Sequence, residues 1–442
     1  MKDDKNEYVG VDALGTAKFF IHFGEKAKAN QILDMVLPLC TTMEQLDEIG
    51  YAYTKNRNFK KGLEVALKQL PKAKDPTQMW DARVNVIRSC LNANMPDEAY
   101  RYIKANKALK PTDQQTLADE AYALFLLNRK DEGEKILRAI VAKPDTQDIF
   151  ERCTFNLGSY DLRNGNFKLG MRNFLLSGRK FKIWEEYKME NEFWDGAVLP
   201  GKTVVLMAEG GIGDEIINVR FMKHVASLGM TPVWYSTRKD LADVFRRCGF
   251  TVVTSMHEIK KDWLWTYGML SPVYLNVDED KLWDGPYLQP KVVSTPGKKK
   301  IGLKVAGNPF YDHDLARQLP LEEVLAAIPE DYEIYSFHKD EPFDHPRVIN
   351  WMTDETTWDD TLNKISEMEC MISSCTSLVH AAGAMGKKTF VLVPILKYYL
   401  WSNDKLHSPW YGDNMHVLHQ IKQHKWDEPL AILTDFLSKP ND

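Results

Sequence analysis

A small residue recurs at a nearly constant interval through the first 180 residues of this chain. It occurs at intervals of 35, 37, 34 and 37 residues, at Ala27, Gly62, Ala99, Gly133 and Gly170. Polar or charged residues lie just before the small residue, and apolar residues around it follow helical spacing. A repeat of this length is typical of helix–turn–helix units, because the small residue lets two antiparallel helices approach closely. We therefore predict that residues 1–180 form a solenoid of paired helices.

The period near 34 residues favours tetratricopeptide-like repeats over an ordinary helical bundle. A bundle would also show periodic apolar residues, but not a regularly spaced small residue. The segment from Phe155 to Phe174 fits the repeat best, and the first repeat is the most degenerate.

Length and composition indicate a soluble protein of two or three domains. The chain has 442 residues, of which 44% are hydrophobic and 27% charged, and its net charge of −5 argues against a generally nucleic-acid-coating surface. Its cysteines lack CxxC spacing, so neither a disulfide framework nor a zinc site is indicated. Without an apolar leader or an 18-residue apolar run, we expect a cytoplasmic protein with no membrane span.

After a connector at 181–200, short β-branched runs alternate with amphipathic helices. Strands are expected at 203–207, 231–235 and 251–254, with a helix at 215–228, and these form a first lobe at 201–290. A proline-rich linker at 283–300 precedes a second lobe at 298–442, with strands near 301–305, 332–337, 370–373 and 389–393. Alternating strands and helices imply parallel sheets. The predicted fold class is α + α/β, with a helical solenoid followed by two Rossmann-like lobes.

Each lobe contains a strand that ends in a tight polar turn and leads into a helix. In the first lobe, residues 209–215 follow the apolar run 204–207, and in the second, residues 373–380 follow 370–372. Helix N-termini expose unpaired N–H groups, and loops at the carboxyl ends of parallel strands form a crevice. The two turns therefore predict a small anionic ligand between the lobes.

In the second lobe, Thr376 and Ser377 stand where a helix begins and could bind a diphosphate through hydroxyl and backbone N–H groups. Thr376 could instead be a simple N-cap. Lys304 or Arg317 could neutralise phosphate charge, although Lys304 could also be a solvated edge residue. His380, one helical turn after Thr376, could face the ligand or pack at the lobe interface.

In the first lobe, Asp214 follows a run of glycines that permit close approach of a ligand to the backbone. A carboxylate at this position could accept a proton from an attacking hydroxyl, or could simply interact with the helix dipole. The turn is not GxGxxG, which weakens a dinucleotide-binding interpretation. The acidic runs 278–280 and 312–314 are interpreted as surface turns rather than metal sites.

The order of motifs in residues 194–426 resembles bacterial tetratricopeptide proteins of the ADP-heptose:lipopolysaccharide heptosyltransferase-like family, which have the GT-B fold. The helical repeats also resemble those of protein O-GlcNAc transferases, which join such repeats to a GT-B catalytic part, but the lobe motifs fit the heptosyltransferase-like branch better. The residues that carry the resemblance to the heptosyltransferase-like family are Trp194–Gly196, Leu199–Thr203, Ala208–Glu215, Arg220–Phe221, Leu270–Pro272, Pro286–Leu288, Gly302–Pro309, Arg317–Pro320, Cys375–Gly386, Ser408–Tyr411 and Gln420.

The resemblance implies a glycosyltransferase that moves a sugar from a nucleotide-diphosphate sugar to a hydroxyl acceptor with inversion, with no metal and no cofactor. By motif position Asp214 would be the general base, in an acceptor-side turn with Gly211, Gly213 and Glu215. The donor-binding positions would be Lys304, Gly307, Asn308, Arg317, Thr376, Ser377 and His380. The acceptor would be a macromolecule (a glycan, a protein or a modified nucleic acid) docked by the repeats.

One position departs from the family pattern, because many relatives carry Asp where this chain has Cys375. This motivates an alternative, a non-catalytic scaffold protein with a degenerate transferase lobe. A third possibility is a sugar-nucleotide epimerase of GT-B fold, which the repeats disfavour because they suggest a macromolecular acceptor. The sugar, the nucleotide and the oligomeric state stay open.

Overall fold

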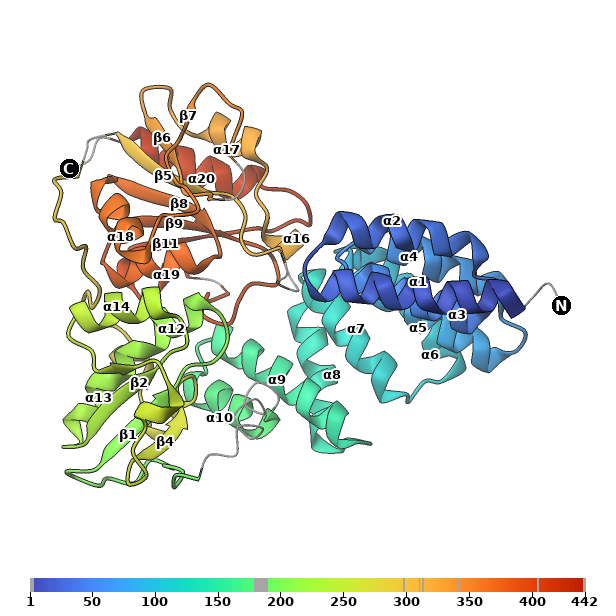
Figure 1. Ribbon diagram of the computed structural model, residues 1–442, viewed down its shortest axis with the longest axis horizontal. Coiled ribbons are helices and arrows are strands. Elements are labelled where there is room, and N and C mark those ends of the chain that lie inside the picture. The colour runs from blue at the N-terminus through green and yellow to red at the C-terminus, as the bar shows by residue number, and fades with distance from the viewer. Residues whose placement is uncertain are drawn as a thin grey trace. The chain divides into compact units, whose positions relative to one another are not determined.

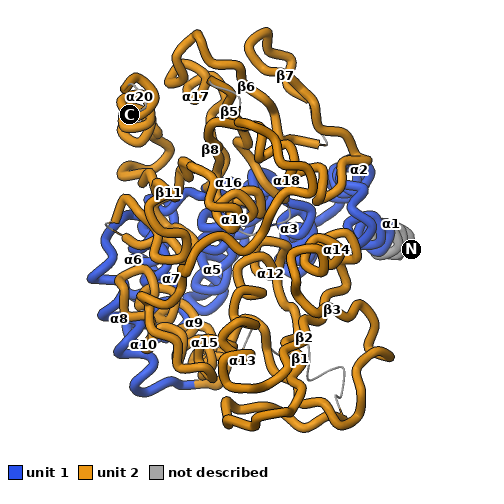
Figure 2. The backbone as a smooth tube through the Cα atoms, turned by 90° about the vertical axis from the view of Figure 1, so that its left-hand side faces the viewer, with its two compact units in different colours: residues 1–145, 309–316 blue, residues 146–308, 317–442 orange. Residues whose placement is uncertain are grey.

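The computed structural model describes residues 4–178, 190–296, 299–309, 311, 314–339, 342–403 and 405–439, with the side chains of residues 4–12 left aside. The chain divides into two compact units (Figure 2). Unit 1 comprises residues 1–145 and 309–316, and unit 2 comprises residues 146–308 and 317–442. The second part of the 181–200 connector is described, but 181–189 lie outside the described residues, as do Asp312 and His313.

Unit 1 is helical, and its helices pack in consecutive pairs (Figure 1). Each pair also contacts the next one, so neighbouring pairs share the core of a stacked array. Unit 2 begins with one more such pair. The helices are α1 (Asp4–His22), α2 (Lys26–Val36), α3 (Met43–Lys55), α4 (Phe59–Gln69), α5 (Pro76–Asn92), α6 (Pro96–Leu109), α7 (Gln114–Leu126) and α8 (Lys130–Ala142) in unit 1, then α9 (Gln147–Arg163) and α10 (Phe167–Ser177).

The recurring small residue lies where the second helix of a pair crosses the first. A Cβ atom at Gly133 would lie 2.9 Å from the backbone oxygen of Ala121, on α7. Gly62, Ala99, Gly133 and Gly170 each occupy the fourth position of their helix, which confirms the helical part of the prediction. In the first pair the predicted residue is wrong by two positions, because Ala27 is exposed and Ala29 is the residue buried at the crossing.

The rest of unit 2 contains two largely parallel sheets, one in each lobe. In the described residues the first sheet has the strand order β3-β2-β1-β4 and the second β10-β11-β9-β8-β5-β6-β7, with only the β10–β11 pair antiparallel. The strands are β1 (Thr203–Met207), β2 (Thr231–Tyr235), β3 (Val252–Val253), β4 (Leu264–Tyr267), β5 (Lys300–Lys304), β6 (Glu333–Ser336), β7 (Val348–Asn350), β8 (Cys370–Ser374), β9 (Thr389–Val393), β10 (His407–Ser408) and β11 (Gly412–His419).

Both sheets follow the strand order of a doubly wound Rossmann fold. Counted from β1 and from β5, with β10 left out, the orders are 3-2-1-4 and 3-2-1-4-5-6. The order reverses between β1 and β4 in the first lobe and between β5 and β8 in the second. In folds of this kind, ligands bind outside the carboxyl ends of the strands at that reversal. The fold class of helices followed by two α/β lobes is therefore as predicted at this level.

Helices flank both sheets, and the two lobes share apolar core. One cluster of buried side chains runs from Val204 and Trp234 of the first lobe to Met371 and Leu378 of the second. The helices are α12 (Ile212–Asn218), α13 (Met222–Ser227), α14 (Lys239–Arg247), α15 (Ser271–Tyr274), α16 (Asp314–Arg317), α17 (Leu321–Ala327), α18 (Trp358–Glu367), α19 (Ser377–Ala384) and α20 (Asp427–Ser438). Short 3₁₀ turns are η1 (Leu37–Leu39), η2 (Leu70–Lys72), η3 (Val219–Phe221), η4 (Met256–Glu258) and η5 (Glu279–Lys281).

Two segments that were expected to be connectors pack against the lobes. Phe193 forms a parallel bridge to Trp265 at the edge of the first sheet, and the side chain of Trp194 is 1% exposed. In the proline-rich segment, the backbone N–H groups of Tyr287 and Leu288 both donate to the carbonyl of Ala384, at 2.9 and 3.1 Å. Part of that segment therefore fastens the two lobes to each other.

A methyl group at Gly170 tests the close approach of α9 and α10. A Cβ there would lie 2.8 Å from the backbone oxygen of Gly158 and 2.8 Å from the backbone nitrogen of Leu162. We expect Gly170→Ala to lower the free energy of unfolding by about 1–3 kcal/mol, as overpacked cores do, in urea denaturation. The control is Gly15→Ala on α1, where a Cβ meets nothing within 4 Å and helix propensity predicts a gain of up to about 1 kcal/mol. Equal stability of the two variants would contradict this.

Candidate functional site

The two predicted turns lie at the strand-order reversals of the two sheets. The glycine turn follows β1, beside the end of β4. The second turn, Cys375–Thr376, follows β8 beside the end of β5, because Ser373 and Ser374 still belong to the strand and Ser377 begins α19. The two turns also meet each other, because α12 packs on α19 (Figure 1). A Cβ at Gly213 would lie 2.7 Å from Cδ2 of His380 and 3.6 Å from Cα of Ser377. Only glycine at 213 allows the two helices to begin this close together.

Asp214 lies in the first turn of α12, and both of its carboxylate oxygens have hydrogen-bond donors. Oδ2 accepts from the backbone N–H of Gly211 at 2.7 Å, which stabilises the start of the helix. Oδ1 accepts from the hydroxyl of Tyr398, which belongs to the second lobe. The carboxylate is half-buried and therefore lies at the junction of the two lobes rather than on an open surface.

Glu215 stabilises the same turn from a buried position. Its carboxylate is fully buried, pairs with the guanidinium of Arg238 and accepts from Nε1 of Trp234 at 3.2 Å. Arg238 also donates to the carbonyl of Gly210 at 2.9 Å. Gly210 has a φ of +74°, a conformation that favours glycine. Glu215 therefore fixes the backbone of the turn through Arg238.

In the second lobe, Thr376 is the N-cap residue of α19, yet its side chain makes no capping hydrogen bond. Its hydroxyl lies instead 3.4 Å from that of Ser373, so the simple N-cap interpretation does not describe this side chain. Ser377, the first residue of the helix, is half-buried. The N-cap side chain therefore does not bond the first backbone N–H groups of α19. Such N–H groups at a helix N-terminus favour anions.

Arg317 braces the turn that follows β5 against the turn that follows β8. Its guanidinium donates to the carbonyl of Cys375 at 2.6 Å and to the carbonyl of Asn308 at 3.3 Å. A Cβ at Gly307 would clash with this guanidinium and lie 3.1 Å from Cγ2 of Thr376. Gly307, Asn308, Arg317 and Thr376 therefore converge, with Asn308 exposed. This places a positive charge beside the start of α19.

Lys304 and Cys375 have local partners in the second lobe. The ammonium of Lys304, at the end of β5, donates to the carbonyl of Phe337 at 3.0 Å, on the β6 side. The thiol of Cys375 accepts from Nε1 of Trp401 at 3.0 Å, and burial raises the pKa of this thiol. A buried thiol that stays protonated is a poor nucleophile, so Cys375 acts as a packed hydrogen-bonding group.

His380 is a buried residue of the lobe interface. Its ring stacks on Trp401 with centroids 5.5 Å apart, and its Nδ1 lies 2.9 Å from the hydroxyl of Tyr411. Burial, with the positive charges of Arg220 and Arg317, lowers the pKa of His380 to about 3. The ring is therefore neutral at neutral pH, which fits the packing alternative for this residue.

Two residues of the junction were not among the predicted site residues, although Arg220 lies in a motif that carries the family resemblance. Arg220 is buried and donates to the carbonyls of Leu282 and Trp410 at 2.7 and 2.5 Å and to the hydroxyl of Tyr287 at 2.8 Å. Arg220 thus links the first lobe to the carbonyl of Trp410, just before β11 of the second lobe. Tyr398, which contacts Asp214, lies in a run of aromatic residues that a reader of the sequence alone would assign to the core.

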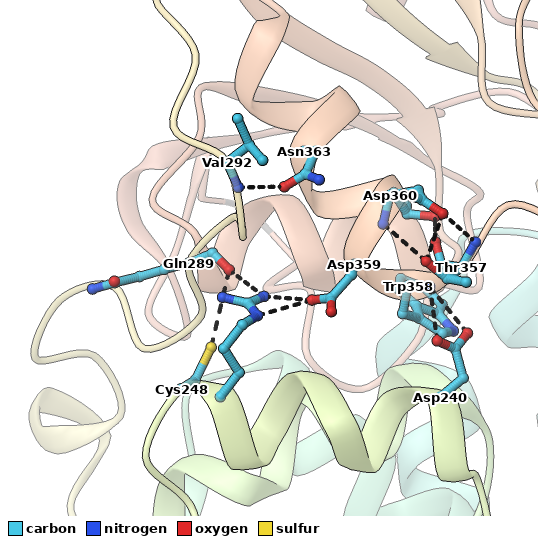
Figure 3. A network of polar contacts seen from close by, with 11 residues as sticks. Asp240, Cys248, Gln289, Val292, Thr357, Trp358, Asp359, Asp360 and Asn363 are labelled. Atoms are coloured by element: carbon cyan, nitrogen blue, oxygen red, sulfur yellow. Dashed lines mark hydrogen bonds and ion pairs between the residues drawn. The ribbon is translucent and has the colours of Figure 1, made fainter.

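On the far side of the junction, α14 meets the start of α18 (Figure 3). Asp240 accepts from the backbone N–H of Trp358 at 3.0 and 3.1 Å, so a carboxylate of the first lobe caps a helix of the second. Arg247 donates to Asp359 at 2.7 and 2.9 Å and to the carbonyl of Gln289 at 2.8 Å. The packing of α12 on α19 and the polar contacts between α14 and α18 therefore hold the two lobes together.

No group of three or more His, Cys, Asp or Glu side chains in the described ranges is arranged to hold a metal ion. Within those same ranges, no helix is both long enough and apolar enough to cross a bilayer.

Comparison with solved structures shows a distant likeness. No family model matches the chain, and no curated protein matches it. Among solved structures, the chain is similar to a lysine-to-methionine mutant of the O-GlcNAc transferase of Thermobaculum terrenum, with 11% sequence identity and a TM-score of 0.33. The match covers 90% of this chain and 91% of that one. A likeness at this TM-score supports no statement about function.

The neutral state of His380 predicts a pH-dependent stability. Below pH ~6.5 an unfolded histidine binds a proton that buried His380 excludes, so the free energy of unfolding falls as the pH drops from ~6.5 toward the folded pKa of about 3. Between pH 7.5 and 5.5, wild type should lose about 1 kcal/mol more than His380→Gln. Urea denaturation followed by tryptophan fluorescence measures this. The same pH dependence in both proteins would mean that His380 is protonated in the fold.

Proposed function

We propose that this chain is a glycosyltransferase of GT-B arrangement, which transfers a sugar from a nucleotide-diphosphate sugar to a hydroxyl group with inversion and without a metal. The main supporting observation is that the turns at the two strand-order reversals lie against each other. The glycine turn of one Rossmann-like sheet lies against the helix N-terminus of the other, with Gly213 beside Ser377. A donor bound at one reversal would therefore face a carboxylate at the other.

The donor diphosphate would bind at the start of α19. Backbone N–H groups of a helix N-terminus favour an anion, and the hydroxyls of Thr376 and Ser377 could add hydrogen bonds. Gly307 leaves no side chain between this helix and the turn after β5. Arg317 lies beside the same point, and Lys304 stands at the end of β5. Because α12 packs directly on α19, the diphosphate would lie toward the exposed Asn308 side of the helix start.

Asp214 would be the general base of a single displacement. As the acceptor oxygen attacks the anomeric carbon, its proton passes to Oδ1 of Asp214. The bond from the anomeric carbon to the diphosphate oxygen breaks, and its electron pair leaves with the diphosphate. The start of α19 and Arg317 would stabilise that developing charge. The hydrogen bond from Gly211 to Oδ2 fixes the carboxylate so that Oδ1 faces the second lobe.

A macromolecular acceptor, docked on the helical repeats, completes the proposal. The repeats present stacked helix pairs, an architecture that commonly forms extended binding surfaces. Which sugar, nucleotide and acceptor are used is a question for a screen of nucleotide sugars.

Two observations favour a second candidate, a scaffold protein whose transferase lobes no longer bind a donor. Both oxygens of Asp214 are engaged within the protein, and Cys375 is packed under Trp401 where many relatives carry Asp. Calorimetric titration with UDP, ADP, GDP and CDP separates the two functions. An active transferase should bind at least one of these nucleotides, and a scaffold with a degenerate lobe should bind none.

Replacement of Asp214 tests the base assignment. Asn keeps an oxygen for the Gly211 N–H but cannot take a proton, so Asp214→Asn should lower turnover by about 10²–10⁴-fold while nucleotide affinity stays nearly unchanged. Turnover is measured as nucleotide release from UDP-, ADP-, GDP- and CDP-sugars, and affinity by calorimetry. The matched control is Asp243→Asn, an exposed carboxylate of α14 that pairs with Arg246. Full turnover in Asp214→Asn would remove this residue from the base role.

A further inference from the structure

A hydroxyl group of the protein itself occupies the oxygen of Asp214 that the acceptor would use. The donor to Oδ1 is Tyr398, in the segment that follows β9 of the second lobe. Tyr398 is half-buried, and its ring lies against that of Tyr399, with centroids 4.4 Å apart. A phenol that donates to Oδ1 makes the same hydrogen bond that an attacking acceptor hydroxyl would make to a general base.

The last helical pair determines where Tyr398 lies. Nη1 of Arg163, at the end of α9, donates to the carbonyl of Lys397 at 3.0 Å, one residue before Tyr398. The backbone N–H of Asn403 donates in turn to the carbonyl of Arg163 at 2.8 Å. The ring of Phe174 on α10 packs edge-on against Tyr399 at 5.0 Å. Helices α9 and α10 therefore fix both ends of the segment that carries the phenol.

We propose that Tyr398 is a positioning residue that stands in for the acceptor on Asp214 and keeps water from the base until an acceptor displaces it. The inference rests on the proposed transferase function and extends it to the choice between water and acceptor. Water is the competing acceptor in any such reaction, and a closed site must exclude it. Arg163 supports this role from α9, so the α9–α10 pair and the base are joined through one short segment.

Tyr398→Phe removes the hydroxyl and keeps the ring. The first measurement needs no substrate and follows modification of Asp214 by a water-soluble carbodiimide and glycine ethyl ester, with peptide mass spectrometry. We expect the modification rate of Asp214 to rise several-fold in Tyr398→Phe. The matched control is Tyr335→Phe in the same lobe, which also removes a tyrosine-to-carboxylate hydrogen bond, that of Tyr335 to exposed Glu333 at 3.0 Å. An unchanged rate in Tyr398→Phe overturns the proposal.

The second measurement is hydrolysis of UDP-glucose, UDP-N-acetylglucosamine, GDP-mannose and ADP-glucose in the absence of an acceptor. Tyr398→Phe should raise kcat for hydrolysis several-fold at unchanged KM, because water reaches the vacated oxygen. A merely structural role would lower kcat instead. Arg163→Lys, which removes the bond to the Lys397 carbonyl, should raise kcat in the same direction, and Tyr335→Phe should behave as wild type.

The remaining outcomes separate this inference from the function on which it rests. Faster modification of Asp214 with no binding of UDP, ADP, GDP or CDP would confirm the contact but reject the transferase, and the stand-in role with it. Binding and hydrolysis with no gain in Tyr398→Phe would leave the transferase intact and overturn the role of Tyr398. A sugar-sized mass gain on the Tyr398 peptide of wild type would make Tyr398 an acceptor rather than a stand-in, which also overturns the proposal.

Discussion

The contact between the first turns of α12 and α19 determines how the two lobes can work together. It depends on Gly213, because any Cβ at that position would meet His380 and approach Ser377. Each turn lies at the strand-order reversal of its own sheet, where α/β folds bind ligands. One packing contact between two helix N-termini thus brings a carboxylate and an anion-favouring site to the same place. The proposed chemistry follows from that geometry.

Buried polar groups, as well as apolar core, fix the lobes in this relation. Arg220 directs its guanidinium to backbone carbonyls and a tyrosine hydroxyl. It also lies over the rings of Tyr287 and Tyr411, 4.8 and 4.9 Å from their centroids, where cation–π attraction stabilises its charge. A buried arginine is costly unless its N–H groups are satisfied in this way. The α14–α18 contacts of Figure 3 add a second set of hydrogen bonds on another side of the junction.

Local sequence patterns predicted the parts of the fold that local physics controls. The strands expected at 203–207, 231–235 and 389–393 have the observed bounds, because continuous apolar runs between turn residues leave little alternative. Strands β4, β7, β10 and β11 were not predicted: they are short or interrupted by polar residues, and their sheet neighbours decide their conformation. The helix expected at 215–228 begins earlier, at Ile212, because Gly211 is the N-cap, and it is interrupted by η3.

The candidate site was predictable only where residues and turns are adjacent in sequence. The spacing placed Asp214, Thr376 and Ser377 at helix starts, which the structure also shows. It could not separate the alternatives for His380, since burial against Trp401 and Tyr411 is a property of the assembled junction. The contacts of Tyr398 and Arg317 could not be predicted either. Tyr398 lies 184 residues from Asp214 in the sequence, and Arg317 binds a backbone carbonyl of a distant turn. Such contacts arise from topology, and no local pattern encodes them.

A crystal structure of the chain with a bound nucleoside diphosphate would test the central claim most directly. The account predicts the diphosphate within hydrogen-bond distance of the backbone N–H groups at the start of α19, beside Ser377, with Arg317 nearby and Asp214 facing the same space. A nucleotide bound elsewhere, with α12 and α19 packed as they are here, would contradict it.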